Sequence, residues 1–248
     1  MPRCRSLLVA DLDGTLIGDS AATQRLLDIH HRLGGALGLA IATGRSRTSA
    51  LEVLKSCGFE PDLLAGLATS VGTELYLDGG RTLDPDYWAP FEEGWSPSAV
   101  REALDPLAGL VPQPEEDQRR FKVSYFVRDV PSVAERVRLH LSAAGLHVTT
   151  VFSQEQYLDV LPLGMSKGSA AKYLADLLGL PQQAVMAAGD SGNDEAMLLS
   201  GCQATVVANH KPELEHLILS PGVYFAKAPY ADGVLEGLRH WGLIPNAR

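Results

Sequence analysis

The strongest constraint on the fold is a short, almost wholly apolar run near the start of the chain, which two aspartates follow. Residues 6–10 read Ser-Leu-Leu-Val-Ala, and Asp11 and Asp13 follow directly. A run of this length without polar alternation is typical of a strand buried on both faces of a parallel sheet. Such a sheet must be covered by helices on both sides, so the run predicts an α/β fold.

Buried strands and helices alternate at both ends of the chain. A strand followed by a helix and then by a second parallel strand is the unit from which open, doubly wound sheets are built. We therefore expect a doubly wound, mainly parallel, Rossmann-like core sheet. The expected strands are residues 6–10, 37–43, 184–188, 204–207 and 223–226, and the expected helices are residues 21–33, 45–56, 167–178, 194–199 and 231–240.

The middle of the chain differs from both ends. It is richer in proline and aromatic residues, contains a charged loop at residues 113–120, and offers strands at residues 122–127 and 157–161 around a helix at residues 133–144. Its length of roughly 80 residues suits a domain. We expect a first core part at residues 1–80, an inserted, smaller α+β cap domain at residues 81–164 and a second core part at residues 165–248.

Composition restricts the partners. A net charge of −9 argues against nucleic acid and against an anionic membrane surface, because both are usually bound by a basic face. No run approaches the roughly 20 apolar residues of a membrane span, and the apolar run before Asp11 is too short for a secretion signal. The three cysteines, Cys4, Cys57 and Cys202, are far apart and odd in number, which favours a reducing compartment. We expect a cytoplasmic monomer.

Asp11 and Asp13 are the first candidate site residues. Residues at i and i+2 of an extended chain point the same way, so both carboxylates should face one site. Their repulsion is relieved by a divalent cation between them or by protonation of one. A cap of a simple turn is the plain alternative. A calcium loop of EF-hand type is not supported, because Ala22 stands where a bidentate glutamate is needed.

Two further candidates suit a phosphate group. Thr43, Gly44 and Arg45 follow the second expected strand where a helix should start, so a hydroxyl and free backbone N–H groups would face a phosphate. Lys167 stands in the first turn of an expected helix, where the helix dipole opposes a cation unless an anion lies nearby. An ordinary threonine cap and a solvated surface lysine are the alternatives.

The fourth candidate follows a late apolar strand and reads Gly-Asp-Ser-Gly-Asn-Asp at residues 189–194. Asp190 between glycines at a strand end suits a metal ion with oxygen ligands. Asp194 has a simpler alternative as a favourable acid in a first helical turn. A nucleophile loop of trypsin-like serine proteases is not supported, because Asn193 stands where glycine is expected and no histidine occupies a partner motif.

In this order, the four elements resemble the four motifs of the haloacid-dehalogenase superfamily of phosphatases. The resemblance implies Mg²⁺ as cofactor, an aspartyl-phosphate intermediate and a small-molecule phosphate as partner. It implies that Asp11 is the nucleophile and Asp13 the general acid and base. The phosphate ligands would be Thr43 and Lys167, and the substrate-binding residues would be Gly44, Arg45 and Asn193. The metal-binding residues, directly or through water, would be Asp11, Asp13 (through its backbone carbonyl), Asp190 and Asp194.

A narrower resemblance covers most of the chain. Residues 69–76, 121–125, 158–162 and 224–227 are similar to segments of sucrose-phosphate phosphatases. That family implies a cap closing over the core and a disaccharide 6-phosphate substrate, and Lys122 is our candidate for a cap residue that reaches it.

Two points leave other substrates and activities open. Gly14 stands where that family often has Asn, and related bacterial enzymes act on mannosylfructose phosphate or other glycosyl phosphates. A broad sugar-phosphate, nucleotide or flavin phosphatase is an alternative, and a receiver-like protein that stores phosphate on an aspartate is another.

Overall fold

The computed structural model describes residues 4–245. The chain divides into two compact units. The core unit comprises the chain up to Asp84 and from Lys167 on, and the insert unit runs from Pro85 to Ser166. The boundaries predicted from the sequence follow residues 80 and 164. No described helix combines the length and the apolar character that crossing a membrane requires.

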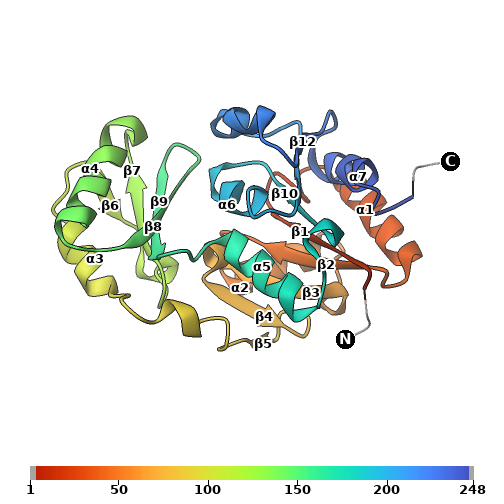
Figure 1. Cartoon of the computed structure of the whole chain (residues 1–248), viewed down its shortest axis with the longest axis horizontal. Coiled ribbons are helices and arrows are strands. Elements are labelled where there is room, and N and C mark those ends of the chain that lie inside the picture. Colours follow the sequence, from red (N-terminus) through yellow and green to blue (C-terminus); the bar gives the residue numbers. More distant parts are fainter. Residues whose placement is uncertain (1–3, 246–248) are drawn as a thin grey trace. The chain divides into compact units, whose positions relative to one another are not determined.

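The core unit contains one eight-stranded sheet (Figure 1). Its order is β12-β11-β10-β1-β2-β3-β4-β5, and its first six strands are parallel, whereas β4 and β5 are antiparallel to their neighbours. The predicted α/β class with a mainly parallel sheet is confirmed. The strands are β1 (Ser6–Ala10), β2 (Leu37–Ala42), β3 (Leu64–Thr69), β4 (Glu74–Leu77), β5 (Thr82–Leu83), β10 (Val185–Gly189), β11 (Gln203–Val206) and β12 (Val223–Phe225).

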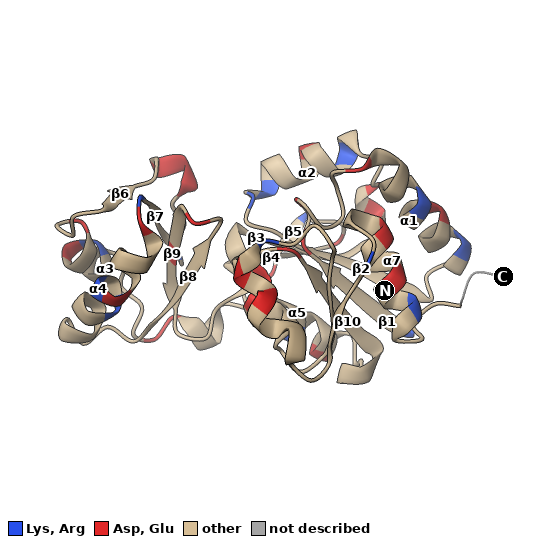
Figure 2. Ribbon diagram, turned by 90° about the horizontal axis from the view of Figure 1, so that it is seen from above, with Lys and Arg blue, Asp and Glu red and all other residues tan. Residues whose placement is uncertain are grey.

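Helices cover both faces of this sheet. Figure 2 shows α1 and α2 on one side and α5 on the other. The first side holds the main apolar core, in which Leu26 and Leu27 of α1 and Leu54 of α2 lie with strand residues such as Leu39. The helices of the core unit are α1 (Ser20–Leu33), α2 (Arg47–Ser56), α5 (Lys167–Leu177), α6 (Glu195–Leu198) and α7 (Tyr230–His240).

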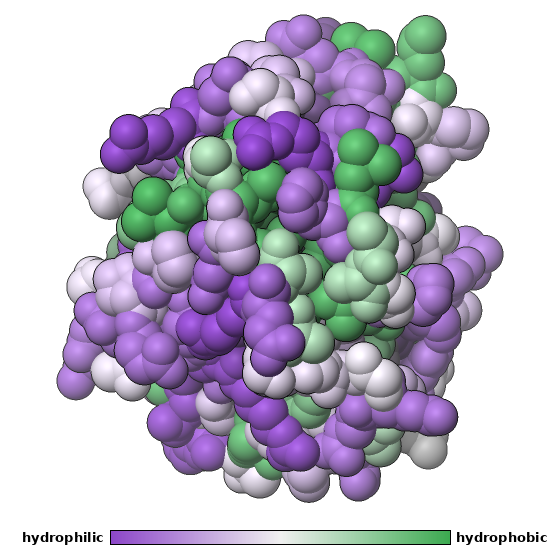
Figure 3. Space-filling model, turned by 90° about the vertical axis from the view of Figure 1, so that its left-hand side faces the viewer, coloured by the Kyte–Doolittle hydropathy of each residue, from purple (hydrophilic) through white to green (hydrophobic). Residues whose placement is uncertain are grey.

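The insert unit has its own antiparallel sheet and its own core. The sheet order is β6-β7-β9-β8, and the helices contribute Val100, Leu104, Val133 and Val137 to a cluster with buried strand residues. Hydrophilic residues cover most of the face seen in Figure 3, with apolar side chains exposed among them. The elements are α3 (Pro97–Leu104), β6 (Leu110–Pro112), β7 (Val123–Val127), α4 (Val130–Ala143), β8 (Val148–Ser153) and β9 (Tyr157–Pro162).

Candidate active site

Three of the predicted loops follow adjacent parallel strands. Asp11 follows β1, Thr43 follows β2 and Asp190 follows β10, and these strands are neighbours in the sheet. The backbone N–H of Asp11 donates to the carbonyl of Ala188 on β10 at 2.9 Å, which ties the first loop to the last strand before Asp190. The carboxyl ends of adjacent parallel strands meet at one edge, and this edge is where open α/β sheets bind ligands.

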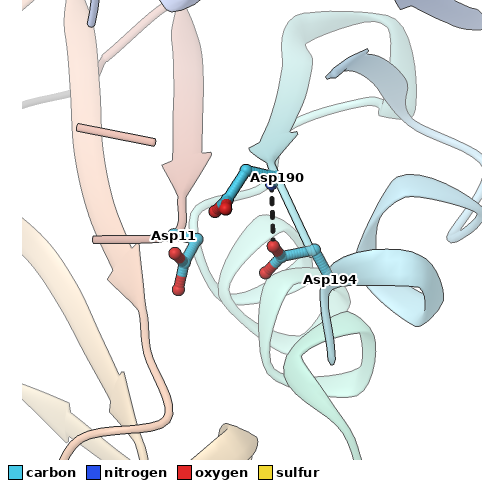
Figure 4. Close-up of side chains that lie close together, drawn as sticks. All are labelled: Asp11, Asp190 and Asp194. Atoms are coloured by element: carbon cyan, nitrogen blue, oxygen red, sulfur yellow. Dashed lines mark hydrogen bonds between the residues drawn. The ribbon is translucent and has the colours of Figure 1, made fainter. Parts of the chain in front are cut away.

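A cluster of three buried carboxylates lies at this edge (Figure 4). One carboxylate oxygen from each of Asp11, Asp190 and Asp194 lies within 4.8 Å of the others. Asp194 Oδ2 accepts hydrogen bonds from the backbone N–H groups of Asp190 (2.9 Å) and Ser191 (3.0 Å). The Thr15 hydroxyl donates to Asp190 Oδ1 at 2.9 Å. Backbone and side-chain donors therefore fix where the three acids stand.

Lys167 supplies the positive charge of the cluster. Its Nζ donates to Asp11 Oδ1 at 2.6 Å, to Asp194 Oδ1 at 2.7 Å and to Asn193 Oδ1 at 2.8 Å, and its side chain is wholly buried. Burial by itself would lower the pKa of this ammonium group, but the charges of Asp11 and Asp194 outweigh it and raise the pKa. The predicted anions near Lys167 are these side chains, and the solvated surface lysine is wrong.

The cluster carries an excess of negative charge. Burial raises the pKa of Asp11 well above its ordinary range; Lys167 opposes this, and the charges of Asp194 and Asp190 add to it. Burial, reinforced by Asp194, raises the pKa of Asp190 to about 6. Three carboxylates and one ammonium group leave two formal negative charges in a site that water barely reaches. Such an excess is relieved by protons or by a divalent cation.

The donor set fits a hard divalent cation such as Mg²⁺, which prefers oxygen ligands. Both oxygens of Asp194 already accept hydrogen bonds. By contrast, Asp11 Oδ2 and Asp190 Oδ2 accept none from the residues that the structure describes. Asp11 and Asp190 are thus the residues best able to ligate an ion, and Asp194 shapes the loop that presents Asp190.

Asp13 lies outside this cluster, contrary to the expectation that it would face the same site as Asp11. Its carboxylate pairs with the guanidinium of Arg45 through two contacts of 2.6 and 2.7 Å, and its side chain is 45% exposed. The expectation assumed extended chain through Asp13. The strand ends at Ala10, and the chain then turns, with the N–H groups of Leu16 and Ile17 both donating to the Leu12 carbonyl.

The loop after β2 is arranged differently from the predicted helix start. Helix α2 begins at Arg47, and Ser46 is its N-cap, accepting from the Ser49 N–H. Thr43 is fully buried, and its Oγ1 accepts the backbone N–H of Arg45 at 3.2 Å. Gly44 lies beside Asn193, because a Cβ at Gly44 would be 3.7 Å from Asn193 Nδ2. The loop therefore meets the loop that follows Asp190.

Lys122 belongs to the insert unit and is buried there. Its Nζ pairs with Asp159 at 3.2 Å, and the Ser124 hydroxyl donates to the same carboxylate oxygen at 2.6 Å. The predicted contact of Lys122 with substrate stays a prediction.

Two residues that hold the site loops were not predicted from the sequence: Thr15, whose hydroxyl donates to Asp190, and Asn209, whose side chain donates to the Gly14 carbonyl. Thr15 was visible as a hydroxyl four residues after Asp11, whereas Asn209 follows β11 and carries no local signal.

A cavity of about 470 Å³ lies elsewhere in the core unit and contains none of the predicted site residues. It is lined by the end of α1 and by the starts of β2 and β3, including His30, Leu37 and Leu64. These strand starts are at the opposite edge of the sheet from Asp11 and Asp190.

Two solved structures show which known fold the chain has. A sugar phosphatase of haloacid-dehalogenase subclass IIB covers 96% of this chain with a TM-score of 0.70 at 18% identity, which is a likeness of fold. The sucrose-phosphatase of Synechocystis, solved with sucrose and phosphate, covers 96% of this chain and 98% of its own with a TM-score of 0.89 at 32% identity. This fold is that of the haloacid-dehalogenase superfamily hydrolases.

The family follows from sequence. Residues 4–242 match the sucrose-6F-phosphate phosphohydrolase family, and the chain belongs to it. The mannosylfructose-phosphate phosphatase of Agrobacterium fabrum is 35% identical over 96% of this chain and 98% of its own. The probable sucrose-phosphatase 3a of Arabidopsis thaliana is 32% identical over 98% of this chain, which spans 61% of the plant protein. The chain is therefore a phosphoric monoester hydrolase, and the receiver-like alternative is wrong.

Proposed function

We propose that the protein hydrolyses the phosphate ester of a disaccharide phosphate, either sucrose 6-phosphate or a related glycosyl phosphate such as mannosylfructose phosphate. The observation that carries the proposal is the buried contact of Asp11 with Lys167 beside Asp190 in a chain of this family. Two relatives that match over nearly their whole length, a mannosylfructose-phosphate phosphatase and a sucrose-phosphatase, support the substrate class.

The Asp11 carboxylate acts as the nucleophile. One of its oxygens attacks phosphorus, the bond from phosphorus to the sugar oxygen breaks, and an aspartyl phosphate forms. Lys167 keeps one Asp11 oxygen oriented through the 2.6 Å contact and offsets its charge as the phosphate approaches. The described contacts leave the Thr43 hydroxyl hydrogen free to donate to a phosphate oxygen, and the Gly44 N–H lies in the same loop.

Mg²⁺ held by Asp11, Asp190 and the backbone carbonyl of Asp13, with Asp194 behind them, would supply positive charge to the phosphate oxygens. Asp194 keeps the loop of Asp190 in place through two backbone N–H contacts, and Thr15 orients the Asp190 carboxylate. The test is removal of metal by EDTA, which should abolish turnover, with recovery on addition of Mg²⁺ and not of Na⁺.

Asp13 carries the proton in both half-reactions. It gives a proton to the departing sugar oxygen and later takes one from the water that hydrolyses the aspartyl phosphate. In the structure its carboxylate accepts two contacts from Arg45, so this role requires that the ion pair opens when substrate binds. The insert unit is proposed as the cap that holds the sugar and excludes water.

The nucleophile is tested by Asp11→Asn, which should abolish turnover, and by Asp13→Asn, which should leave at most a slow trace. A freely active Asp11→Asn protein would refute the assignment. The substrate is tested by comparing kcat/KM for sucrose 6-phosphate, mannosylfructose phosphate, hexose phosphates and flavin mononucleotide. Comparable values for all four would remove the disaccharide assignment and favour a broad phosphatase.

The protein is further proposed to act in the cytoplasm as a monomer. The net charge of −9 and the three cysteines, which are free thiols in the structure, support a reducing compartment without nucleic-acid partners. Sedimentation at several protein concentrations tests the oligomeric state, and a concentration-dependent dimer would contradict the proposal.

A further inference from the structure

The segment that follows β11 forms hydrogen bonds with two of the site loops, the loop after β1 and the loop after β10. The Asn209 side chain donates from Nδ2 to the Gly14 carbonyl at 2.7 Å. Two residues later, the backbone N–H of Lys211 donates to the Asp190 carbonyl at 2.7 Å. One short segment therefore holds the loop after Asp11 and the residue Asp190 at the same time.

Gly14, the residue that Asn209 holds, lies next to the carboxylate cluster. It has φ +82°, and a Cβ at this position would lie 2.5 Å from Asp190 Oδ2. The backbone of Gly14 thus lies directly against the carboxylate that offers a free oxygen to a cation. Glycine has no side chain, so the Gly14 backbone and the Asp190 carboxylate are in direct contact. A shift of the Gly14 peptide therefore changes the space available to the Asp190 carboxylate and its ligand.

The other end of the Asn209 side chain is anchored to α7. Its Oδ1 accepts the backbone N–H of Tyr230, the first residue of that helix, at 2.8 Å. Tyr230 has φ +51°, an uncommon conformation for a residue with a side chain, and its ring lies against Gly18, where a Cβ would be 2.2 Å away. Asn209 is thus fixed at both ends of its amide group, which makes it a rigid spacer.

We propose that Asn209 is a positioning residue for the proposed cation site: its amide holds the Gly14 peptide against Asp190 and so sets the separation of the Asp11 and Asp190 carboxylates. The inference rests on the proposed function, because it assumes that these carboxylates ligate a divalent cation. The hydrogen bonds of the Asn209 side chain within the described residues go to Gly14 and Tyr230, not to the three carboxylates.

The test compares Asn209→Ala with Glu236→Ala. Glu236 accepts the N–H groups of Lys227 and Ala228 and thus holds the same connection into α7 without reaching Gly14. For each variant, the rise of Tm is measured as a function of MgCl₂ concentration without substrate, and kcat and KM are measured with sucrose 6-phosphate at saturating Mg²⁺. Asn209→Gln is a third variant, in which a longer amide should displace Gly14 rather than release it.

Asn209→Ala should need about fivefold more MgCl₂ than wild type for the same rise of Tm above its metal-free value, the effect of one lost hydrogen bond, and should lower kcat with little change in KM. Glu236→Ala should lower Tm and leave the Mg²⁺ dependence within about twofold. Equal Mg²⁺ dependence in Asn209→Ala, Asn209→Gln and wild type would overturn the positioning role while leaving the proposed function intact. A wild-type protein that shows no Mg²⁺-dependent Tm shift would overturn the cation site and the inference with it.

Discussion

Lys167 offers the sharpest test of the site's electrostatics, through the substitution Lys167→Met. The three carboxylates lie within 4.8 Å of one another, and at that separation each ionised pair repels by about 3.5 kcal/mol at an effective dielectric constant of 20. Three such pairs amount to roughly 10 kcal/mol. On the same basis the Lys167 ammonium, 2.6 Å from Asp11 and 2.7 Å from Asp194, contributes about 12 kcal/mol of attraction, which offsets this repulsion.

Proton uptake by the carboxylates limits the stability that is lost when Lys167 is replaced. Protonating one carboxyl group with an ordinary pKa near 4 costs about 4 kcal/mol at pH 7 and only about 1.4 kcal/mol at pH 5. The variant escapes the repulsion by taking up a proton, so its free energy of unfolding should fall by about 4 kcal/mol at pH 7 and by about 1–2 kcal/mol at pH 5. The loss is larger at pH 7 because a carboxyl group whose pKa is raised in the folded state lowers the stability of the protein as the pH rises.

The assay is urea unfolding followed by circular dichroism at pH 5 and pH 7 in EDTA. The control is Lys172→Met, an exposed lysine on the same helix whose pair with Asp176 should contribute less than about 1 kcal/mol. If Lys167→Met unfolds at the same urea concentration as Lys172→Met at pH 7, Lys167 does not offset a repulsion between the three carboxylates, and the electrostatic account of the site is refuted.

Three other predictions address the same site. Gly14→Ala should lower kcat/KM about a hundredfold or more in steady-state assays, because the added methyl group meets Asp190 and φ +82° strains an alanine; unchanged kcat/KM would contradict the close approach. Arg45→Met should change Tm little, since its pair with Asp13 is partly exposed, and should leave kcat unchanged or higher, because Asp13 acts only once that pair has opened; a kcat lowered tenfold or more would contradict that opening. Because a cation and a proton compete for Asp190, whose pKa is raised to about 6, Mg²⁺ affinity by calorimetry should fall about tenfold for each pH unit below that value, and a flat profile from pH 5 to 7 would argue against Asp190 as ligand.

The sequence predicted those parts of the structure that local pattern determines. The apolar runs at residues 6–10, 37–43 and 184–188 became β1, β2 and β10, because strands buried on both faces need no polar alternation. The order of strands at the centre of the sheet brings Asp11 and Asp190 together, and both were identified from their place after a strand.

The third strand was not predicted. Its residues include Ala65, Gly66 and Ala68, which have weak strand preference. They form β3 because they pair with β2 and because a helix lies against them: a Cβ at Gly66 would be 2.7 Å from Leu174 of α5. The small residues are a consequence of that close approach, which only the tertiary structure reveals.

The residues that contact Asp13 and Lys167 also could not be predicted from local sequence pattern. Alternation placed Asp13 beside Asp11, but the turn after Ala10 gives its carboxylate to Arg45, and no periodicity rule describes a turn. Lys167 was selected because a cation in a first helical turn is unfavourable, and its anions come from loops that lie 156 and 27 residues away in the chain. Contacts of that range are set by strand order.

The pairing of β1 with β10 has a consequence for synthesis of the chain. Leu7 lies opposite Val185, so the first strand waits for a partner made 178 residues later, which takes about 9–36 s at 5–20 residues per second. During that interval a mainly apolar strand has one edge without its native neighbour, and such edges promote aggregation. Release of the newborn protein before Val185–Gly189 is translated should therefore give a species that chaperones retain, whereas the insert unit, whose strands all lie between residues 110 and 162, has its complete sheet available earlier.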